Sequence, residues 1–366
     1  MKKKLNILQV LPSLESGGVE RGTLELANYL VLKGHGSYVI SFGGRLVKEL
    51  TDHGTKHTKI NIGRKSLFTF LHIPKIIHFI KENKIDIVHV RSRFPAWVIY
   101  MALFFIGKNR PRFVTTVHGY NSVSIYSKIM TKGDKVVVVS KFIQDFIIKT
   151  YKVNKSKTVL IHRGVPSQLK PLKTNEFLLW KKGFENNFTQ LRDSKILTLS
   201  ARVSRTKGIE VFIKLIEKLV KEKRKIHAII VGEAKSSNYH NQLIKKINEL
   251  GIEKKVTFLG YREDIYNIIQ YSDISYCLSS TPEPFGRGVI ESIKLGTPVI
   301  AFDHGGAGEQ LKEIFPEGLV KNNDFINLYE KSITFLNKKP TIKKTKSFSL
   351  ETMLKKTLDL YRDLIE

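Results

Sequence analysis

Short apolar runs rich in β-branched residues recur along the whole chain, and amphipathic segments separate them. Some runs, such as Val136–Val139, are apolar at every position, as expected for strands covered on both faces of a parallel sheet. The predicted strands are Leu5–Leu11, Tyr38–Phe42, Ile85–Val90, Phe113–Val117, Lys135–Val139 and Thr158–His162, then Ile196–Ala201, His227–Val231, Val256–Leu259, Ile274–Leu278 and Pro298–Phe302.

The segments between these runs have the periodicity of helices that bury one face. The predicted helices are Val19–Lys33, Leu67–Lys81, Lys141–Tyr151, Ile209–Lys221, Asn241–Leu250, Arg287–Leu295 and Asp324–Leu336. Alternating strands and helices predict an α/β protein with two doubly wound, Rossmann-like parallel sheets. Ligands of such sheets bind beyond the carboxyl ends of the strands, so we expect the two domains to face an interdomain cleft.

A polar, poorly periodic segment from about Pro166 to Ser194 separates the two halves, and it contains a predicted short helix near Trp180. The chain has 366 residues, 42% of them hydrophobic, which is typical of two globular domains rather than one. We place the first domain at residues 1–170 and the second at residues 171–345.

Residues 346–366 form a third, short segment at the end of the chain. It contains an amphipathic helix with Leu354, Leu358 and Tyr361 on one face. We expect this helix to pack against the body of the protein.

The formal net charge is +29, from 62 basic and 33 acidic residues, and this excess predicts an anionic partner. The lysines are spread along the chain, and no arginine-rich helix or aromatic-basic RNA-binding motif stands out. We therefore favour a negatively charged membrane surface or an acidic substrate over nucleic acid, although a lysine-rich composition alone explains part of the charge.

The chain has a single cysteine, Cys277, which excludes an intramolecular disulfide framework and fits a reducing, cytoplasmic compartment. In the run ISYCLSS it is expected to be a small core residue. The opening MKKKLNILQV is read as a first strand and not as a signal peptide. The most apolar segment, Ala96–Gly107, is shorter than the roughly 20 residues that span a bilayer.

The segment Pro282–Pro298 carries the most informative chemistry. It places Glu283 in a loop and Glu291 within the helix that follows, just over two helical turns later. The backbone N–H groups around Phe285 to Gly288 open that helix and favour an anion. A ligand with hydroxyl groups at both ends and phosphate between them, such as a nucleotide-sugar, fits this arrangement.

Two cations flank the loop after the first strand of the second half. Arg202 follows that strand and Lys207 precedes the next helix, so together they are placed to straddle a diphosphate. Such cations would neutralise the charge that develops on a departing diphosphate. The competing interpretation is an ordinary solvated basic loop.

Three further sequence features give weaker evidence of a functional role. Gly17 and Gly18 open the first predicted helix and allow close approach of a phosphate or sugar, or else form an ordinary turn. His118 ends a strand at the expected cleft, where it would either bond a sugar hydroxyl or have only a structural role. His304 is expected to be structural or peripheral to the site, and Glu309 to cap a helix.

Several enzyme classes are disfavoured by what the sequence lacks. There is no Gly-x-Gly-x-x-Gly, Walker or Gly-x-Ser-x-Gly motif, and no cluster of His, Cys and Asp with the spacing of metal ligands. We therefore expect no metal and no cofactor.

The segment EPFGRGVIE, with Glu283 and Glu291, resembles the E-x7-E motif of the retaining glycosyltransferases of family 4. Arg202 to Lys207 resembles that family's R-x4-K element, and GGVE resembles its N-terminal glycine loop. The resemblance implies the GT-B fold, with an N-terminal acceptor domain, a C-terminal nucleotide-sugar domain and a last helix that returns to the first. It also implies metal-independent transfer with retention at the anomeric carbon.

The resemblance also implies roles for individual residues. Glu283 would contact the donor sugar and Glu291 the ribose hydroxyls, while Arg202 and Lys207 would hold the diphosphate. The implied contacts to sugar or phosphate oxygens come from Phe285, Gly286 and Arg287; Gly17 and Gly18 would line the cleft and His118 would touch the sugar. Arg91 and Arg93 are candidates for binding an anionic acceptor.

The phrases VRSRFPAW, VTTVHGYN and PVIAFDHGGAGE resemble bacterial lipopolysaccharide-core mannosyltransferases. This narrower resemblance implies GDP-mannose as donor, a Kdo–lipid A acceptor and a peripheral position on the inner membrane. Two alternatives stay open: a GT-B enzyme for another sugar, including a UDP-sugar epimerase, and a basic binding protein that kept the fold without catalysis.

Overall fold

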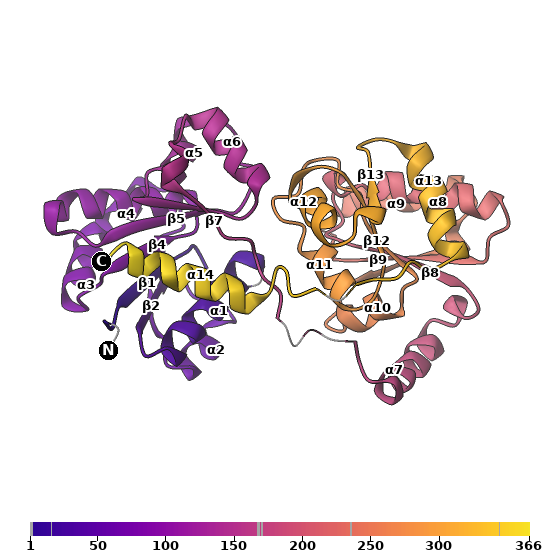
Figure 1. The fold of residues 1–366 in the computed structure, drawn as a ribbon, viewed down its shortest axis with the longest axis horizontal. Helices are drawn as coiled ribbons and strands as arrows, with labels where there is room; N and C mark the ends of the chain where they lie inside the picture. The colour runs from indigo at the N-terminus through magenta and orange to yellow at the C-terminus, as the bar shows by residue number, and fades with distance from the viewer. Residues whose placement is uncertain (1–2, 16, 167–168, 170, 235, 344) are drawn as a thin grey trace. The chain divides into compact units, whose positions relative to one another are not determined.

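The computed structural model describes residues 3–15, 17–166, 169, 171–234, 236–343 and 345–366. The chain divides into two compact units (Figure 1). The N-terminal unit comprises residues 1–162 and 350–366, and the C-terminal unit comprises residues 163–349. Each unit is built on one parallel sheet, so the predicted α/β class with two Rossmann-like domains is confirmed.

The sheet of the N-terminal unit has seven strands in the order β3-β2-β1-β4-β5-β6-β7, and every pairing is parallel. The strands are β1 (Asn6–Val10), β2 (Gly36–Ser41), β3 (Lys56–Lys59), β4 (Ile87–Val90), β5 (Arg112–Val117), β6 (Lys135–Val138) and β7 (Thr158–Leu160). The strand β3 was not predicted, because its sequence Lys-His-Thr-Lys has no apolar residue and it lies at the sheet edge.

The helices of the N-terminal unit are α1 (Gly18–Leu32), α2 (Val47–Asp52), α3 (Ile73–Glu82), α4 (Arg93–Ile106), α5 (Ile125–Lys128), α6 (Lys141–Tyr151) and α14 (Leu350–Asp363). The prediction of one helix over Leu67–Lys81 is wrong, since a 3₁₀ helix, η1 (Leu67–His72), precedes α3. Proline in the first turn of α3 has no N–H to continue an earlier helix, so a new helix begins there.

The helix α14 follows the C-terminal unit in sequence but belongs to the N-terminal unit. Its Leu354, Leu358 and Tyr361 are buried in one hydrophobic cluster with residues of β1 and α1. The Tyr361 hydroxyl lies 2.5 Å from Nδ1 of His89, which is itself buried, and burial holds the pKa of His89 well below its usual value. A neutral imidazole therefore anchors this helix to the core.

The sheet of the C-terminal unit has six parallel strands in the order β10-β9-β8-β11-β12-β13. The strands are β8 (Lys195–Ser200), β9 (Ile226–Val231), β10 (Val256–Gly260), β11 (Ile274–Cys277), β12 (Val299–Phe302) and β13 (Leu319–Val320). The helices are α7 (Thr174–Asn187), α8 (Ile209–Lys221), α9 (Ser237–Glu249), α10 (Ile265–Tyr271), α11 (Arg287–Lys294), α12 (Gly305–Ile314) and α13 (Phe325–Asn337).

The helix near Trp180 is longer than predicted: α7 has 14 residues and belongs to the C-terminal unit. Its Phe184 joins a hydrophobic cluster with Ile196 and Ile229, and the Trp180 indole donates a hydrogen bond to Asp264 Oδ2 at 3.0 Å. Packing against the rest of the C-terminal unit stabilises this largely polar helix, and sequence periodicity does not predict such contacts.

We predict that protonation of His227 destabilises the C-terminal unit. His227 is buried in β9, its Nε2 lies 2.8 Å from Thr257 Oγ1, and burial, helped by Lys255, lowers its pKa from 6.5 to about 4. Below pH 6.5 the unfolded chain binds a proton at this histidine and the folded chain does not. The free energy of unfolding therefore keeps its full value above pH 6.5 and decreases as the pH falls toward 4. We expect a loss on the order of 1 kcal/mol between about pH 8 and pH 5.5.

Each unit contains one of the two tryptophans, Trp97 and Trp180, so urea unfolding of Trp97→Phe followed by fluorescence reports on the C-terminal unit alone. His227→Gln should reduce the pH dependence of this transition, whereas the exposed His53→Gln should not. An unchanged pH slope in the His227 variant would contradict the assignment.

Candidate functional site

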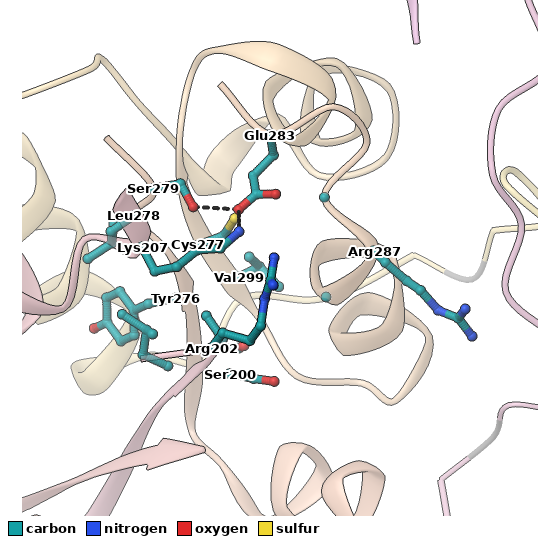
Figure 2. A pocket seen from close by; sticks show the side chains of 15 residues that line it. Ser200, Arg202, Lys207, Tyr276, Cys277, Leu278, Ser279, Glu283, Arg287 and Val299 are labelled. Carbon is teal, nitrogen blue, oxygen red and sulfur yellow. Dashed lines mark hydrogen bonds and ion pairs between the residues drawn. The ribbon is translucent and has the colours of Figure 1, made fainter. Parts of the chain in front are cut away.

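A cavity of about 190 Å³ lies at the carboxyl ends of β8 and β11 in the C-terminal unit (Figure 2). We call it the strand-end cavity. It is lined by Leu199, Ser200, Ala201, Arg202, Lys207, Ser275, Tyr276, Cys277, Leu278, Ser279, Glu283, Gly286, Arg287, Gly288 and Val299. The predicted Arg202, Lys207 and Glu283 therefore share one cavity, together with Gly286 and Arg287.

Lys207 ends a 3₁₀ helix, η6 (Arg205–Lys207), directly before α8. The next residue, Gly208, has φ +71°, and a Cβ there would lie 1.8 Å from the carbonyl oxygen of Leu278. Only glycine allows this close approach to the end of β11. The contact brings Lys207 Nζ within 2.5 Å of Glu283 Oε1, and both side chains are about four-fifths buried (21% and 18% exposed).

Glu283 is fixed from several sides. Its Oε1 also accepts a hydrogen bond from Ser279 Oγ at 2.5 Å, as drawn in Figure 2, and its backbone carbonyl accepts one from the N–H of Gly306 at 2.7 Å. At Gly305, which has φ +60°, a Cβ would lie 2.5 Å from that same carbonyl oxygen. The glycines that open α12 thus allow the Glu283 loop to lie directly on the start of this helix.

His304 and Glu309 also belong to this region. Nε2 of His304 lies 2.8 Å from the carbonyl oxygen of Ser279, which is a structural contact between the loop and the start of α12. His304 holds the cap position of α12, and Glu309 lies inside the helix. The expectation that Glu309 caps this helix is therefore wrong, because the helix begins at the first glycine rather than after it.

Arg202 is exposed and lines the strand-end cavity just beyond β8. Its guanidinium extends toward the Lys207–Glu283 pair, whereas Arg287 extends away from it (Figure 2). In the part of the chain that the structure describes, Arg202 has no ion pair or hydrogen bond. Since Glu283 offsets Lys207, the charge of Arg202 is left to make the cavity positive.

Glu291 lies on α11, whose cap residue Gly286 has φ +78°. Glu291 Oε1 accepts hydrogen bonds from Arg287 Nε at 2.6 Å and from the Tyr266 hydroxyl at 3.3 Å. Burial raises the pKa of Glu291, while Arg287 opposes the rise. The two glutamates are thus differently placed: Glu283 lines the strand-end cavity, whereas Glu291 does not line it and bonds Arg287, which does.

Phe285 is buried and does not line the strand-end cavity. Its ring meets Phe348 edge to face at 5.9 Å, and its carbonyl oxygen accepts a hydrogen bond from Gln310 Nε2. Phe285 thus anchors the loop, and the backbone that lines the cavity begins at Gly286.

Sequence reasoning missed Ser279, Tyr266 and Gln310. Each supports a predicted residue through a hydrogen bond, Ser279 from within the Glu283 loop, Tyr266 from α10 and Gln310 from α12. Ser, Tyr and Gln at these positions belong to no motif, so only the fold identifies them.

A second cavity of about 290 Å³ lies in the N-terminal unit; we call it the Arg91 cavity. It is lined by Pro12, Gly63, Lys65, Arg91, Ser92, Arg93, Phe94, Pro95, Thr116, His118, Gly119, Asn121, Tyr126 and Met130. His118 therefore shares a cavity with both arginines proposed for an anionic ligand.

Arg91 is the most buried cation of this cavity, with 7% of the residue exposed. Its Nη2 and Nε donate to the neutral Gln9 Oε1 at 2.8 and 3.2 Å, and it forms no ion pair with any carboxylate among the described residues. Burial lowers the pKa of Arg91, which Tyr361 and Glu25 partly offset. Arg93 lies nearby, with Nη1 3.0 Å from Ser127 Oγ.

Gly17 and Gly18 lie at the start of α1, with Gly17 at the cap position and φ +146°. A Cβ at Gly17 would lie 2.6 Å from Glu20 Oε2. Neither glycine lines the strand-end cavity or the Arg91 cavity.

Among the residues that the structure describes, no group of three or more His, Cys, Asp and Glu side chains is placed to hold a metal ion. Within the same residues, no helix has the length and apolar character needed to cross a membrane.

Comparisons with known proteins agree with this architecture. The family "Glycosyl transferases group 1" matches residues 183–350, and "Glycosyltransferase Family 4" matches residues 16–169. The crystal structure of a glycosyltransferase from Rickettsia africae ESF-5 is 33% identical with a TM-score of 0.88, and the match covers 100% of this chain and 99% of that one.

Two more distant matches add detail. Spore coat protein SA of Bacillus subtilis is 27% identical over 248 residues, and the match spans 64% of each chain, just under two thirds of that relative's length. Anabaena Alr3699/HepE, solved in complex with UDP and glucose, is 20% identical with a TM-score of 0.83 and matches over 98% of this chain and 100% of its own. At that identity it shows the fold alone.

These matches define the class of protein: a glycosyltransferase with the GT-B fold. More narrowly, the chain belongs to the family 4 type, with the group 1 domain in its C-terminal half.

The single cysteine offers a direct test of the strand-end cavity. Burial, and then the Glu283 carboxylate, raise the pKa of Cys277 to about 12, while Lys207 opposes the rise. We predict that alkylation at about pH 8 is at least ~100-fold slower in the folded protein than in urea, because little thiolate forms.

Glu283→Gln should accelerate this alkylation, since it removes a negative charge and frees Lys207. Glu210→Gln, which changes a carboxylate that does not line the cavity, is the control. Equal rates in the folded and unfolded protein would show that Cys277 lies elsewhere.

Proposed function

We propose that the protein transfers a sugar from a nucleoside-diphosphate sugar to an acceptor hydroxyl, with the donor's diphosphate in the strand-end cavity. The observation that carries the proposal is Arg202, a cation without a described partner, beside the buried Lys207–Glu283 pair. An unoffset cation and a cavity at the carboxyl ends of parallel strands are what a diphosphate requires.

In the proposed reaction, the acceptor oxygen forms a bond to the anomeric carbon while the bond from that carbon to the diphosphate oxygen breaks. Arg202 and Lys207 stabilise the negative charge that grows on the departing diphosphate. We propose that the acceptor attacks from the face the diphosphate leaves, which retains the configuration, and that a diphosphate oxygen takes the acceptor's proton. This scheme requires no metal ion.

Glu283 has a second role in this scheme. When diphosphate oxygens take over Lys207 Nζ, Glu283 Oε1 becomes available to accept hydrogen bonds from the donor sugar, while Ser279 still orients it. We assign the ribose hydroxyls to Glu291, whose carboxylate Arg287 and Tyr266 hold in place. We propose that His118, which lines the Arg91 cavity, bonds a sugar hydroxyl.

GDP-mannose is the first donor to test, because the phrases around Arg91, His118 and the glycines of α12 resemble mannosyltransferases. UDP-sugars are the next, since a protein of the same fold was solved with UDP and glucose. A thermal-shift comparison of GDP-, UDP- and ADP-sugars separates these donors before any acceptor is needed.

We assign the acceptor to the Arg91 cavity. Arg91, Arg93 and Lys65 line it, so an acceptor with a carboxylate or phosphate near its reacting hydroxyl is favoured. A Kdo–lipid A acceptor on the cytoplasmic face of the inner membrane fits this chemistry and the net charge of +29.

We predict that Arg202→Ala and Lys207→Ala each lower turnover by about 100-fold or more, because each removes preorganised charge from the leaving group. The measurement is nucleoside diphosphate released with GDP-mannose and Kdo–lipid A. Arg205→Ala is the matched control, since this neighbouring cation bonds Gln242 Oε1 at 2.7 Å and does not line the cavity. Near-normal turnover in both test variants would refute the proposal.

We also predict that Arg91→Lys raises the KM for the anionic acceptor by about tenfold and leaves the KM for the donor unchanged. Lysine keeps the charge but loses the planar fork that binds a carboxylate or phosphate. Arg45→Lys, an exposed arginine of the same unit outside this cavity, is the control. Equal changes in both KM values would argue against an acceptor role.

A further inference from the structure

The helix α4 has apolar side chains on both its buried and its exposed face. Its inner face, with Ala96, Ile99 and Leu103 among others, is buried in the unit. Its outer face carries a stripe of exposed side chains at helical spacing, and the two most exposed are Phe104 and Phe105, at 74% and 62%. The stripe consists of Tyr100, Met101, Phe104 and Phe105. In a monomer in water, a helix normally places polar residues there.

A second exposed apolar group lies on η1, the 3₁₀ helix directly before α3. It consists of Leu67, Phe68 and Leu71, with Leu67 86% exposed. The ring of Phe70 meets that of Phe94 on α4 edge to face at 5.9 Å, and α3 packs against α4. The η1 group is thus joined to the N-terminal end of α4.

A third group, Val123 and Ile125, lies at the start of α5. The next residue, Tyr126, accepts a hydrogen bond from the Trp97 indole of α4 at 3.1 Å, and Lys65 lies over its ring at 5.8 Å. The three groups therefore occupy neighbouring elements of one unit. They hold nine of the 17 exposed large apolar side chains among the described residues, which marks an interaction surface rather than random exposure.

The charge around these groups has one sign. No Asp or Glu occurs between Ile87 and Gly133, or between His53 and Lys81, so η1, α4 and α5 carry no carboxylate. Exposed cations of the same elements and their flanking loops are Arg64, Lys65, Lys108, Lys128 and Lys132. An apolar surface rimmed by cations complements a bilayer that contains anionic lipid, whose headgroups attract lysine and whose interface accepts aromatic rings.

We propose that the surface formed by η1, α4 and α5 docks on an anionic lipid bilayer, with Phe104 and Phe105 inserted in the interface. This inference goes beyond the proposed function. It rests on that function only for the purpose of docking, which is to bring the Arg91 cavity of the same unit to a lipid-linked acceptor. Docking itself needs neither donor nor acceptor, so it can be measured separately.

The test is sedimentation of the full chain with vesicles of phosphatidylglycerol and phosphatidylethanolamine, and with phosphatidylcholine alone. We expect binding to the anionic vesicles that weakens with added salt, and at least tenfold weaker binding to the neutral ones. The double variant Phe104→Ser/Phe105→Ser should bind the anionic vesicles at least tenfold more weakly.

The matched control is Leu178→Ser/Leu179→Ser, an exposed apolar pair on α7 of the C-terminal unit, which should bind like the native chain. Thermal shifts with a nucleotide-sugar, measured on the same variants, should not change, so a failure of the proposed function is seen apart from a failure of docking. The proposal would be overturned by a native chain that does not bind anionic vesicles, by equal losses in both double variants, or by a dimer that only Phe104→Ser/Phe105→Ser dissociates.

Discussion

The ion pair between Lys207 and Glu283 joins the two loops from which the strand-end cavity is made. The residues are 76 positions apart, and they meet because β8 and β11 are adjacent and parallel, so that both strands deliver their following loops to the same sheet edge. Both side chains are mostly buried, so removal of either partner would leave an unpaired charge in a poorly solvated place. Arg202, Ser279 and the start of α12 are all positioned relative to this pair.

Backbone packing makes that ion pair possible. Gly208 lets η6 lie against the carbonyl of Leu278, and Gly305 lets α12 lie against the carbonyl of Glu283. A side chain at either position would separate a loop from its neighbour by more than a hydrogen bond tolerates. The geometry of the cavity thus depends on two residues that themselves offer no functional group.

Charge is distributed on the same principle in the two cavities. In the strand-end cavity, Glu283 offsets Lys207, and Arg202 has no described partner. In the Arg91 cavity, the one hydrogen-bond acceptor of Arg91 among the described residues is the neutral oxygen of Gln9. A cation without an anionic partner, whether buried like Arg91 or exposed like Arg202, is stabilised when an anionic ligand bonds it. We propose that the donor binds in the strand-end cavity and the acceptor in the Arg91 cavity.

The sequence alone determined the fold class and the main members of the strand-end cavity. Continuous apolar runs such as Val136–Val139 identify buried parallel strands, and strand-loop-helix positions placed Arg202, Lys207 and Glu283 at one edge. Local patterns suffice there because a parallel sheet sends every such loop to the same side.

Other elements of the fold and contacts of the site were decided only by the tertiary structure. The polar edge strand β3 and the helix α7 depend on neighbours far away in the sequence, and so do two supports of the site, Tyr266 and Gln310. The tertiary structure also distinguishes Glu283, which lines the cavity, from Glu291, which bonds Arg287 and does not line it. Spacing along a chain fixes which edge of a sheet a residue reaches, whereas the direction and partner of its side chain depend on packing between elements.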